Sequence, residues 1–315
     1  MPHPDMILVI GANGQIGSEL VATLRTEYGS DCVIATDIRP ANENLIDKGP
    51  FEQLDVLDKS GLERIIRKYK ITTIYHLAAM LSAIAESKPL SGWNLNMGGL
   101  LHVLQASVDL GVSQVFWPSS IAAFGNHSPG QNTPQWSIMD PNTVYGISKL
   151  SGESWCNYYY EKKNLDVRSL RFPGLISYKT LPGGGTTDYA VDIFHHALKS
   201  NHYTCFLKAD TRLPMMYMPD AIRGALQLMD APTEKIKVRT SYNFSAIDFT
   251  PAEIAAAIKK VLPGFSIDYN PDFRQAIAES WPESIDDMQA RKDWDWKPGY
   301  NLDEMVADML QHLRA

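Results

Sequence analysis

Tyr145 and Lys149 are the two residues whose types and spacing best suit acid–base chemistry. They are four positions apart in the sequence, so on a helix their side chains share one face. A free tyrosine has a pKa of about 10 and is a poor base at neutral pH, whereas a nearby cation stabilises the phenolate and lowers that pKa. The pair therefore predicts a general base that takes a proton from a substrate hydroxyl.

Position along the chain distinguishes Tyr145 from other tyrosines. The Tyr-x-x-x-Lys spacing recurs twice further along the predicted helix 144–163, so spacing alone decides nothing. Tyr145 opens that helix, and the preceding predicted strand, 114–117, leads into Ser119 and Ser120. A serine hydroxyl at this strand end can hydrogen-bond the reacting oxygen. We assign that role to Ser120 and a structural role to Ser119; the alternative for both is a turn serine that satisfies backbone groups.

A glycine-rich turn joins the first predicted strand, 6–10, to the first predicted helix, 15–28. Gly11, Gly14 and Gly17 follow the pattern G-x-x-G-x-x-G. Such glycines permit a tight turn, a close approach of the backbone to a pyrophosphate, and close packing of helix on strand. The free N–H groups at the start of the helix then face the phosphates. The turn predicts a dinucleotide site that also includes Asn13, Gln15 and Ile16.

Asp37 ends the second predicted strand, where a carboxylate can bind both hydroxyls of the adenosine ribose. It would repel a 2′-phosphate, so the sequence favours NAD over NADP; Arg39, which could accept that phosphate, is the counter-argument. Two other strand ends are placed to contact the same cofactor. The residues predicted there are Asp55, Val56, His76, Leu77, Ala78 and Ala79. His76 receives no proton-transfer role, because a strand-end histidine is more often packed.

Short apolar runs alternate with helix-length stretches through the first half of the chain. The further predicted strands are 32–35, 73–76 and 166–170, and the further helices are 60–69 and 97–110. This order predicts an α/β fold with a doubly wound parallel Rossmann sheet in residues 1–172. Residues 173–315 contain shorter elements separated by Pro and Gly, so we predict a smaller α/β lobe there, some of whose segments return to the sheet.

Composition excludes several classes of function. The chain has 315 residues, 44% of them hydrophobic, and a formal net charge of −7, so it can form a large core and would repel a nucleic acid backbone. No apolar run approaches the roughly 20 residues that a membrane-spanning helix needs. The three cysteines have no metal-ligand spacing. We therefore expect a cytoplasmic protein that binds no nucleic acid, membrane or metal.

As a group, the glycine-rich turn, Asp37, Ser120 and the Tyr145/Lys149 pair resemble the extended short-chain dehydrogenase/reductases, and the similarity covers essentially the whole chain. The resemblance implies NAD as cofactor, with Lys149 also holding the nicotinamide ribose. It adds Asn96 and Pro173 to the cofactor contacts. It further implies a homodimer that pairs through the helix carrying Tyr145 and the helix before it.

Two departures argue against the nucleotide-sugar substrates of that family. Gly174 stands where the sugar enzymes usually carry an asparagine, and no acidic residue directly follows Ser120. Segments 118–125, 183–189 and 281–287 are instead similar to the short-chain L-threonine 3-dehydrogenases. This similarity implies substrate contacts by Ser82, Ser120, Tyr145, Thr186, Thr187 and Trp281. Each of these contacts has a purely structural alternative: Ser82 could cap a turn, residues 186–188 could form a helix N-cap cluster, and Trp281 could be packed in the core.

The implied activity is the NAD-dependent oxidation of L-threonine at its side-chain hydroxyl to L-2-amino-3-oxobutanoate, which can lose CO₂ to give aminoacetone. L-Serine or another 3-hydroxy amino acid stays open as a substrate. The enzyme alternative is a nucleotide-sugar 4-epimerase or a related sugar-modifying member of the family. A third class is a protein that senses NAD without turning it over, although such proteins typically lose the Tyr or the Lys of the pair, and both are present here.

Overall fold

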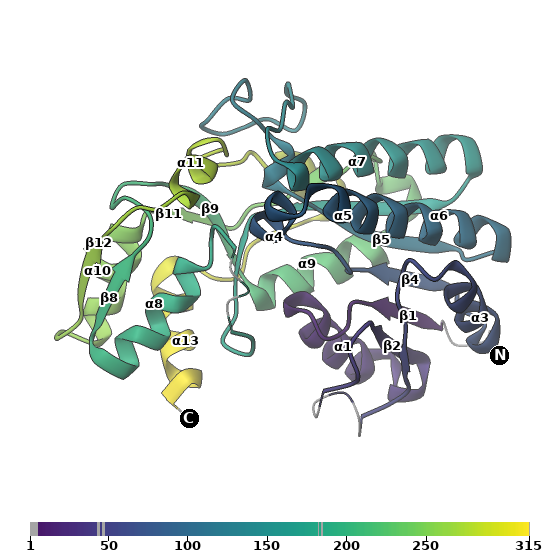
Figure 1. The fold of residues 1–315 in the computed structure, drawn as a ribbon, viewed down its shortest axis with the longest axis horizontal. Helices are drawn as coiled ribbons and strands as arrows, with labels where there is room; N and C mark the ends of the chain where they lie inside the picture. The colour runs from purple at the N-terminus through teal and green to yellow at the C-terminus, as the bar shows by residue number, and fades with distance from the viewer. Residues whose placement is uncertain (1–5, 43–44, 46–47, 182, 184, 315) are drawn as a thin grey trace.

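The larger of the two units of the molecule is built on a parallel sheet (Figure 1). The computed structural model describes residues 6–42, 45, 48–181, 183 and 185–314. All neighbouring strands of this sheet run parallel. In spatial order its strands are β10 (Tyr242–Asn243), β6 (Asp166–Phe172), β5 (Gln114–Ser120), β4 (Thr73–His76), β1 (Ile7–Ile10), β2 (Val33–Asp37) and β3 (Phe51–Gln53).

Helices cover both faces of the large sheet, because its central strands are apolar on both sides. One face packs against α1 (Gln15–Tyr28), α9 (Met218–Asp230) and α12 (Met288–Trp294). The other face packs against α3 (Lys59–Tyr69), α6 (Gly99–Leu110) and α7 (Val144–Lys163). Two short helices, α4 (Ser82–Ser87) and α5 (Pro89–Trp93), lie beside α7.

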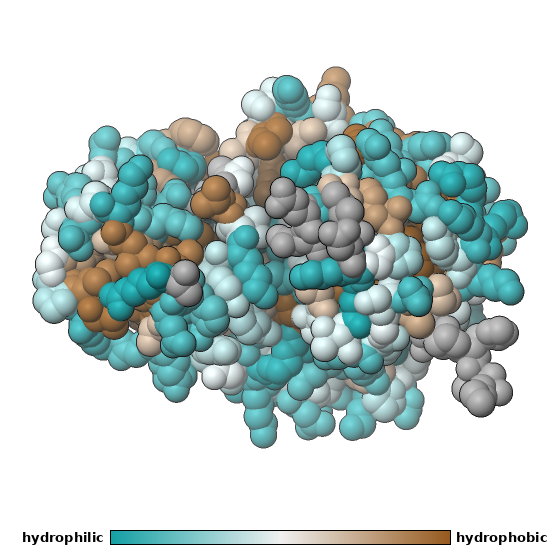
Figure 2. Space-filling view, turned by 90° about the horizontal axis from the view of Figure 1, so that it is seen from below, coloured by the Kyte–Doolittle hydropathy of each residue, from teal (hydrophilic) through white to brown (hydrophobic). Residues whose placement is uncertain are grey.

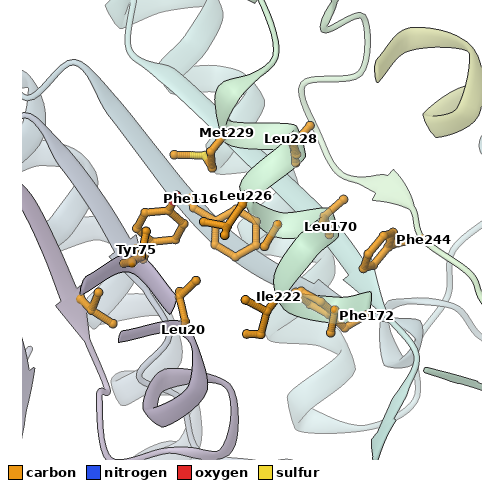
Figure 3. Close-up of a cluster of buried hydrophobic side chains, with 14 of the residues drawn as sticks. Leu20, Tyr75, Phe116, Leu170, Phe172, Ile222, Leu226, Leu228, Met229 and Phe244 are labelled. Atoms are coloured by element: carbon orange, nitrogen blue, oxygen red, sulfur yellow. The ribbon is translucent and has the colours of Figure 1, made fainter. Parts of the chain in front are cut away.

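The core on the α1 side joins segments from both halves of the chain. Figure 3 shows Leu20 of α1 and Phe116 of β5 in one cluster with Ile222 and Leu226 of α9 and with Phe244, which follows β10. Burial of such side chains contributes about 1.5–3 kcal/mol each. The large unit is therefore completed by residues that come late in the sequence.

The smaller unit is a mixed α/β lobe with its own buried cluster. One sheet has the order β11 (Ile247–Phe249), β9 (Leu213–Tyr217), β7 (Gly174–Ile176), and a second pairs β8 (His202–Cys205) with β12 (Ser266–Tyr269). The helices of the lobe are α8 (Tyr189–Ser200), α10 (Pro251–Val261), α11 (Arg274–Glu279) and α13 (Leu302–Arg314).

The predicted fold class, a doubly wound parallel sheet with a smaller α/β lobe, is confirmed. Helices α1 and α7 begin and end at the predicted residues. Strand β5 is longer than predicted, since it continues through Pro118 to Ser120. Proline is tolerated there because β4 pairs with β5 only as far as Phe116, and beyond that point β6 alone continues the ladder.

The surface seen from below is mostly hydrophilic, with a hydrophobic patch over the smaller lobe (Figure 2). Among the helices formed by the described residues, none is long and apolar enough to cross a bilayer.

Candidate active site

A pocket at the carboxyl ends of the large sheet's strands collects residues from both units. This is the edge of a doubly wound sheet where ligands bind. The predicted site residues on its wall are Gly11, Gly14, Gln15, Ile16, Gly17, Leu77, Ala79, Ser82, Ser120, Tyr145, Lys149, Pro173, Thr186, Thr187 and Trp281. An adjoining hollow, which shares Gly11, Gly14, Leu77 and Ala79 with the pocket, adds Asp37, Arg39, Asp55, Val56 and Ala78.

The turn after β1 can be built only with glycine at two positions. Gly11 has φ +89°, and a Cβ there would lie 2.8 Å from the backbone nitrogen of Ala78. A Cβ at Gly17 would overlap the carbonyl oxygen of Gly11. The backbone of the turn is therefore bare where it faces the pocket, and the N-terminus of α1 opens onto the same space.

The carboxylate of Asp37 faces this turn. One oxygen accepts from the backbone N–H of Asn13 (2.9 Å), and the other accepts from the N–H of Arg39 (3.0 Å). The Arg39 side chain pairs with the same carboxylate through Nε at 3.3 Å. Asp37 thus holds the cation that could otherwise attract a 2′-phosphate. The side chain of Asn13 donates to Pro40 O and lies outside the described walls of both hollows.

Tyr145 and Ser120 face each other at the inner end of the pocket. Tyr145 lies in the first turn of α7, which begins where Thr143 Oγ1 accepts from Gly146 N (3.1 Å). Burial raises the pKa of Tyr145 to about 12, and the hydrogen bond with Ser120 opposes that rise. Tyr145 is therefore a neutral phenol here and needs a nearby positive charge to become a base.

Lys149, in the next turn of the helix, is the neighbouring group that can carry such a charge when it is protonated. Its Nζ lies 5.3 Å from the Tyr145 ring centroid and 4.4 Å from that of Trp117, and it donates to Pro118 O at 2.5 Å. Burial lowers the pKa of Lys149 to about 7, and the negative charge of the nearby Glu153 carboxylate opposes this shift. The lysine can therefore gain or lose a proton near neutral pH.

The two serines of β5 have separate partners. Ser119 Oγ donates to Glu153 Oε1 at 2.6 Å and is buried. Ser120 Oγ accepts from Ala122 N at 3.1 Å and can still donate toward Tyr145 and the pocket. The Ser120 hydroxyl therefore has a free donor at the pocket, whereas the Ser119 hydroxyl uses its donor on Glu153.

Thr186 brings an unpaired hydroxyl to the pocket wall. It is 1% exposed, and within the described part of the chain its Oγ1 has no hydrogen-bond partner. An N-cap role does not use it, because the N-cap of α8 is Asp188, whose Oδ2 accepts from Gly185 N at 2.7 Å. Trp281 reaches the same pocket from the loop after α11, and Ser82 reaches it from the start of α4.

Two predicted cofactor contacts lie behind the described walls of both hollows. His76 is 1% exposed, neither ring nitrogen has a partner among the described residues, and burial lowers its pKa to about 3. Asn96 accepts from Met80 N (2.8 Å) and donates to Met80 O and Ser148 Oγ. It joins the loop after β4 to α7, so the structure gives it a positioning task rather than a place in the pocket.

Sequence reasoning missed part of the pocket wall. Leu81, Ile121, Phe172, Gly174, Leu175, Gly185 and Asp188 also line the pocket. Most of them directly neighbour a predicted residue, so extending each predicted segment by one position would have found them. Within the residues that the structure describes, no group of three His, Cys, Asp or Glu side chains could hold a metal ion.

A model of the NAD-dependent epimerase/dehydratase family matches residues 7–244. The chain belongs to this family. An uncharacterized epimerase/dehydratase from Staphylococcus haemolyticus is 47% identical over 309 residues, which are 98% of this chain and 97% of the relative. NAD is the cofactor, and the bare glycine turn with Asp37 fits it.

Solved structures of other proteins are similar over nearly the whole length of this family member. The L-threonine dehydrogenase from Cupriavidus necator in its holo form is 55% identical, with a TM-score of 0.96 over 98% of this chain and 99% of that one. The L-threonine dehydrogenase from Clostridium difficile is 51% identical, with a TM-score of 0.96 over 99% and 98%.

Proposed function

We propose that this member of the family is an L-threonine 3-dehydrogenase. The observation that carries the proposal is that Tyr145, Ser120 and the unpaired Thr186 hydroxyl line the same pocket as Trp281. A short amino acid with a hydroxyl on its third carbon fits these groups: its hydroxyl can bind Tyr145 and Ser120, and its amino or carboxylate group can bind Thr186. Two similar solved structures are named L-threonine dehydrogenases, which supports the same substrate.

In the proposed reaction Tyr145, as phenolate, removes the proton from the threonine hydroxyl while Ser120 donates a hydrogen bond to that oxygen. The positive charge of Lys149 stabilises the phenolate, and Lys149 also holds the nicotinamide ribose. NAD, when bound, supplies the hydride acceptor. The carbon that bears the hydroxyl thereby becomes the ketone of L-2-amino-3-oxobutanoate, which can lose CO₂ to give aminoacetone.

At the substrate end, we propose that Thr186 and Ser82 contact the carboxylate or amino group of threonine. Trp281 forms the apolar wall beside the side-chain methyl, and Thr187 contributes through its own methyl group. Gly185 and Trp281 come from the smaller lobe, so the position of that lobe sets the size of the space. Excluding water from so small a site strengthens each polar contact.

Tyr145→Phe tests the chemistry. We expect NADH formation with L-threonine to fall by about 10²–10⁴-fold, because the general base is lost, while NAD affinity stays at the wild-type value. The measurement is NADH absorbance with L-threonine, L-allo-threonine, L-serine and a UDP-hexose, with NAD binding by calorimetry as the control. Turnover of the UDP-hexose but not of the amino acids would overturn the substrate assignment.

A nucleotide-sugar 4-epimerase is the second candidate, because the family model and the curated relative are both named epimerase/dehydratase. Position 174 argues against it. A Cβ at Gly174 would overlap Met215 Sδ and lie 2.7 Å from Thr187 Cγ2, so a longer polar side chain at this position would require Met215 and Thr187 to move. A protein that only senses NAD is disfavoured by the intact Tyr145 and Lys149.

We also propose a homodimer formed through α5 and α7, which lie side by side (Figure 1). Their outer faces carry large apolar residues that the monomer leaves exposed: Leu90, Trp93, Ile147, Trp155 and Tyr158. Ile147, Trp155 and Tyr158 follow a helical spacing that places them on one stripe of α7. A contiguous apolar stripe of this kind is typical of an interface between subunits.

A further inference from the structure

Behind the proposed catalytic residues lies a buried ion pair that the reaction itself does not use. The side chains of Glu153 on α7 and Arg171 on β6 are each 2% exposed. Arg171 Nε and Nη2 donate to the two carboxylate oxygens of Glu153 at 2.9 and 2.8 Å. A buried ion pair of this kind is expensive to desolvate and adds little net stability. We therefore look for its role in positioning neighbouring residues.

On one side the pair fixes α7 to β5. Glu153 also accepts from Ser119 Oγ at 2.6 Å, and Ser119 directly precedes Ser120. One turn earlier on the helix, Lys149 holds the carbonyl of Pro118. Pro118 and Ser119 of β5 are thus hydrogen-bonded to the helix that carries Tyr145. Ser120 is the next residue of the strand.

On the other side the pair reaches the segment that carries Trp281. Arg171 Nη1 donates to Asn243 Oδ1 at 2.9 Å. The side-chain nitrogen Nδ2 of Asn243 donates to Thr133 O and Asp286 O, both at 2.9 Å. Thr133 in turn pairs with the same segment through Thr133 N to Ser284 O (3.0 Å) and Asp286 N to Thr133 O (3.0 Å).

We infer that Glu153 and Arg171 are positioning residues that hold Ser120, Tyr145 and the Trp281 segment in one fixed arrangement. The network runs from α7 through β5 and β6 to Ser284 and Asp286; its members Ser119, Glu153, Arg171, Asn243 and Thr133 are buried, and Ser284 and Asp286 are half-buried. Reaction geometry is sensitive to displacements of about 1 Å. A planar guanidinium that donates to both oxygens of one carboxylate fixes direction as well as distance. The kinetic side of this inference rests on the proposed function.

The decisive variant is Glu153→Gln, which keeps the shape of the side chain and removes its charge. The control is Glu161→Gln, the same change at an exposed position of the same helix. For Glu153→Gln we expect kcat with L-threonine to fall about tenfold or more and KM for L-threonine to rise, with NAD affinity kept. A merely structural glutamate would lower the unfolding temperature and leave kcat per folded molecule unchanged.

Hydrogen exchange gives a readout that needs no substrate. In Glu153→Gln we expect faster amide exchange in peptides covering 118–124 and 281–287 together, and no change in the peptide covering the glycine turn, 11–17. Wild-type kcat and KM, or unchanged exchange in either of the first two peptides, would overturn the inference. If the wild-type protein does not oxidise L-threonine, the proposed function fails, and exchange alone decides the inference.

Ser119→Ala covers the case in which Glu153→Gln does not fold. It removes only the bond to β5 and leaves the ion pair and its link to Asn243 in place. We expect faster exchange at 118–124, unchanged exchange at 281–287, and a kcat that falls less than in Glu153→Gln. Wild-type kcat together with wild-type exchange at 118–124 would contradict the inference.

Discussion

At the scale of single residues, the burial of Lys149 in the proposed site lowers the stability of the folded protein at neutral pH. Burial moves the pKa of Lys149 from its usual 10.5 to about 7. Between these two values the unfolded chain binds the proton and the folded chain does not, so folding releases a proton. The free energy of unfolding should therefore rise with pH between 7 and 10.5, since the penalty of neutralising the buried lysine disappears.

Lys149→Met tests this linkage. We expect wild-type protein to gain stability relative to Lys149→Met by about 1 kcal/mol or more between pH 7 and pH 10, because the variant has no proton to release. Denaturant unfolding without NAD, at several pH values, measures the difference. Lys162→Met, at an exposed position of the same helix, is the matched control. A stability difference between Lys149→Met and wild type that is independent of pH would contradict the expectation.

Residue types and spacing were enough to propose roles for single residues, but they did not give the contacts that those residues make. Sequence reasoning separated Ser120 from Ser119, and the structure gives the two serines different partners. It placed His76 at the cofactor because His76 ends a predicted strand, and Asn96 because of the family resemblance; neither residue is on the described walls of the two hollows. Whether a side chain at a strand end faces the open edge or points back into the core depends on strand twist and on the packing of α7, and neither can be read from one sequence.

At the scale of elements, the end of β2 decides which dinucleotide fits. Asp37 binds Asn13 N, Arg39 N and the Arg39 side chain at once. Asp37→Ser should weaken NADH binding and release Arg39 toward a 2′-phosphate, so that the preference for NADH over NADPH falls about tenfold or more. Fluorescence titration of the two reduced cofactors measures the ratio.

The double change Asp37→Ser with Arg39→Ala is the control for that prediction. The added affinity for NADPH should disappear, because the freed guanidinium is gone, while the weakened binding of NADH should remain. An equal loss of both cofactors in Asp37→Ser alone would show that the carboxylate supports the loop but does not choose between them.

Elements with strong local signals were predictable from the sequence. Helix α10 begins at a capping box, in which Thr250 and Glu253 lie three residues apart, a spacing that is recognisable in a sequence. Helix α9 was missed, although Pro219 and Asp220 lie in its first turn. Its polar residues Arg223, Gln227 and Asp230 follow a helical spacing opposite the buried residues that pack on the large sheet, so this helix could have been predicted from its amphipathic pattern. The short strands of the lobe pair mostly with distant segments, which local patterns do not report.

At the scale of the whole molecule, the proposed dimer makes its own prediction. Trp155→Glu places a charge in the centre of the apolar stripe on α7 and should convert a dimer into a monomer, because a charge there would be desolvated without a partner. Sedimentation velocity measures the change. Trp136→Glu, at an exposed residue outside α5 and α7, should leave the dimer intact. A wild-type protein that sediments as a monomer would contradict the proposal.

The position of β10 has a consequence for how the chain reaches its folded state. This strand extends the large sheet beyond β6, and α9 covers the apolar face where Phe116 and Leu170 lie (Figure 3). During synthesis the first half of the chain leaves the ribosome with that face open to water. The NAD-binding half cannot close its core until residues near 244 have emerged, so folding of the two halves is coupled and the first half must avoid aggregation while it waits.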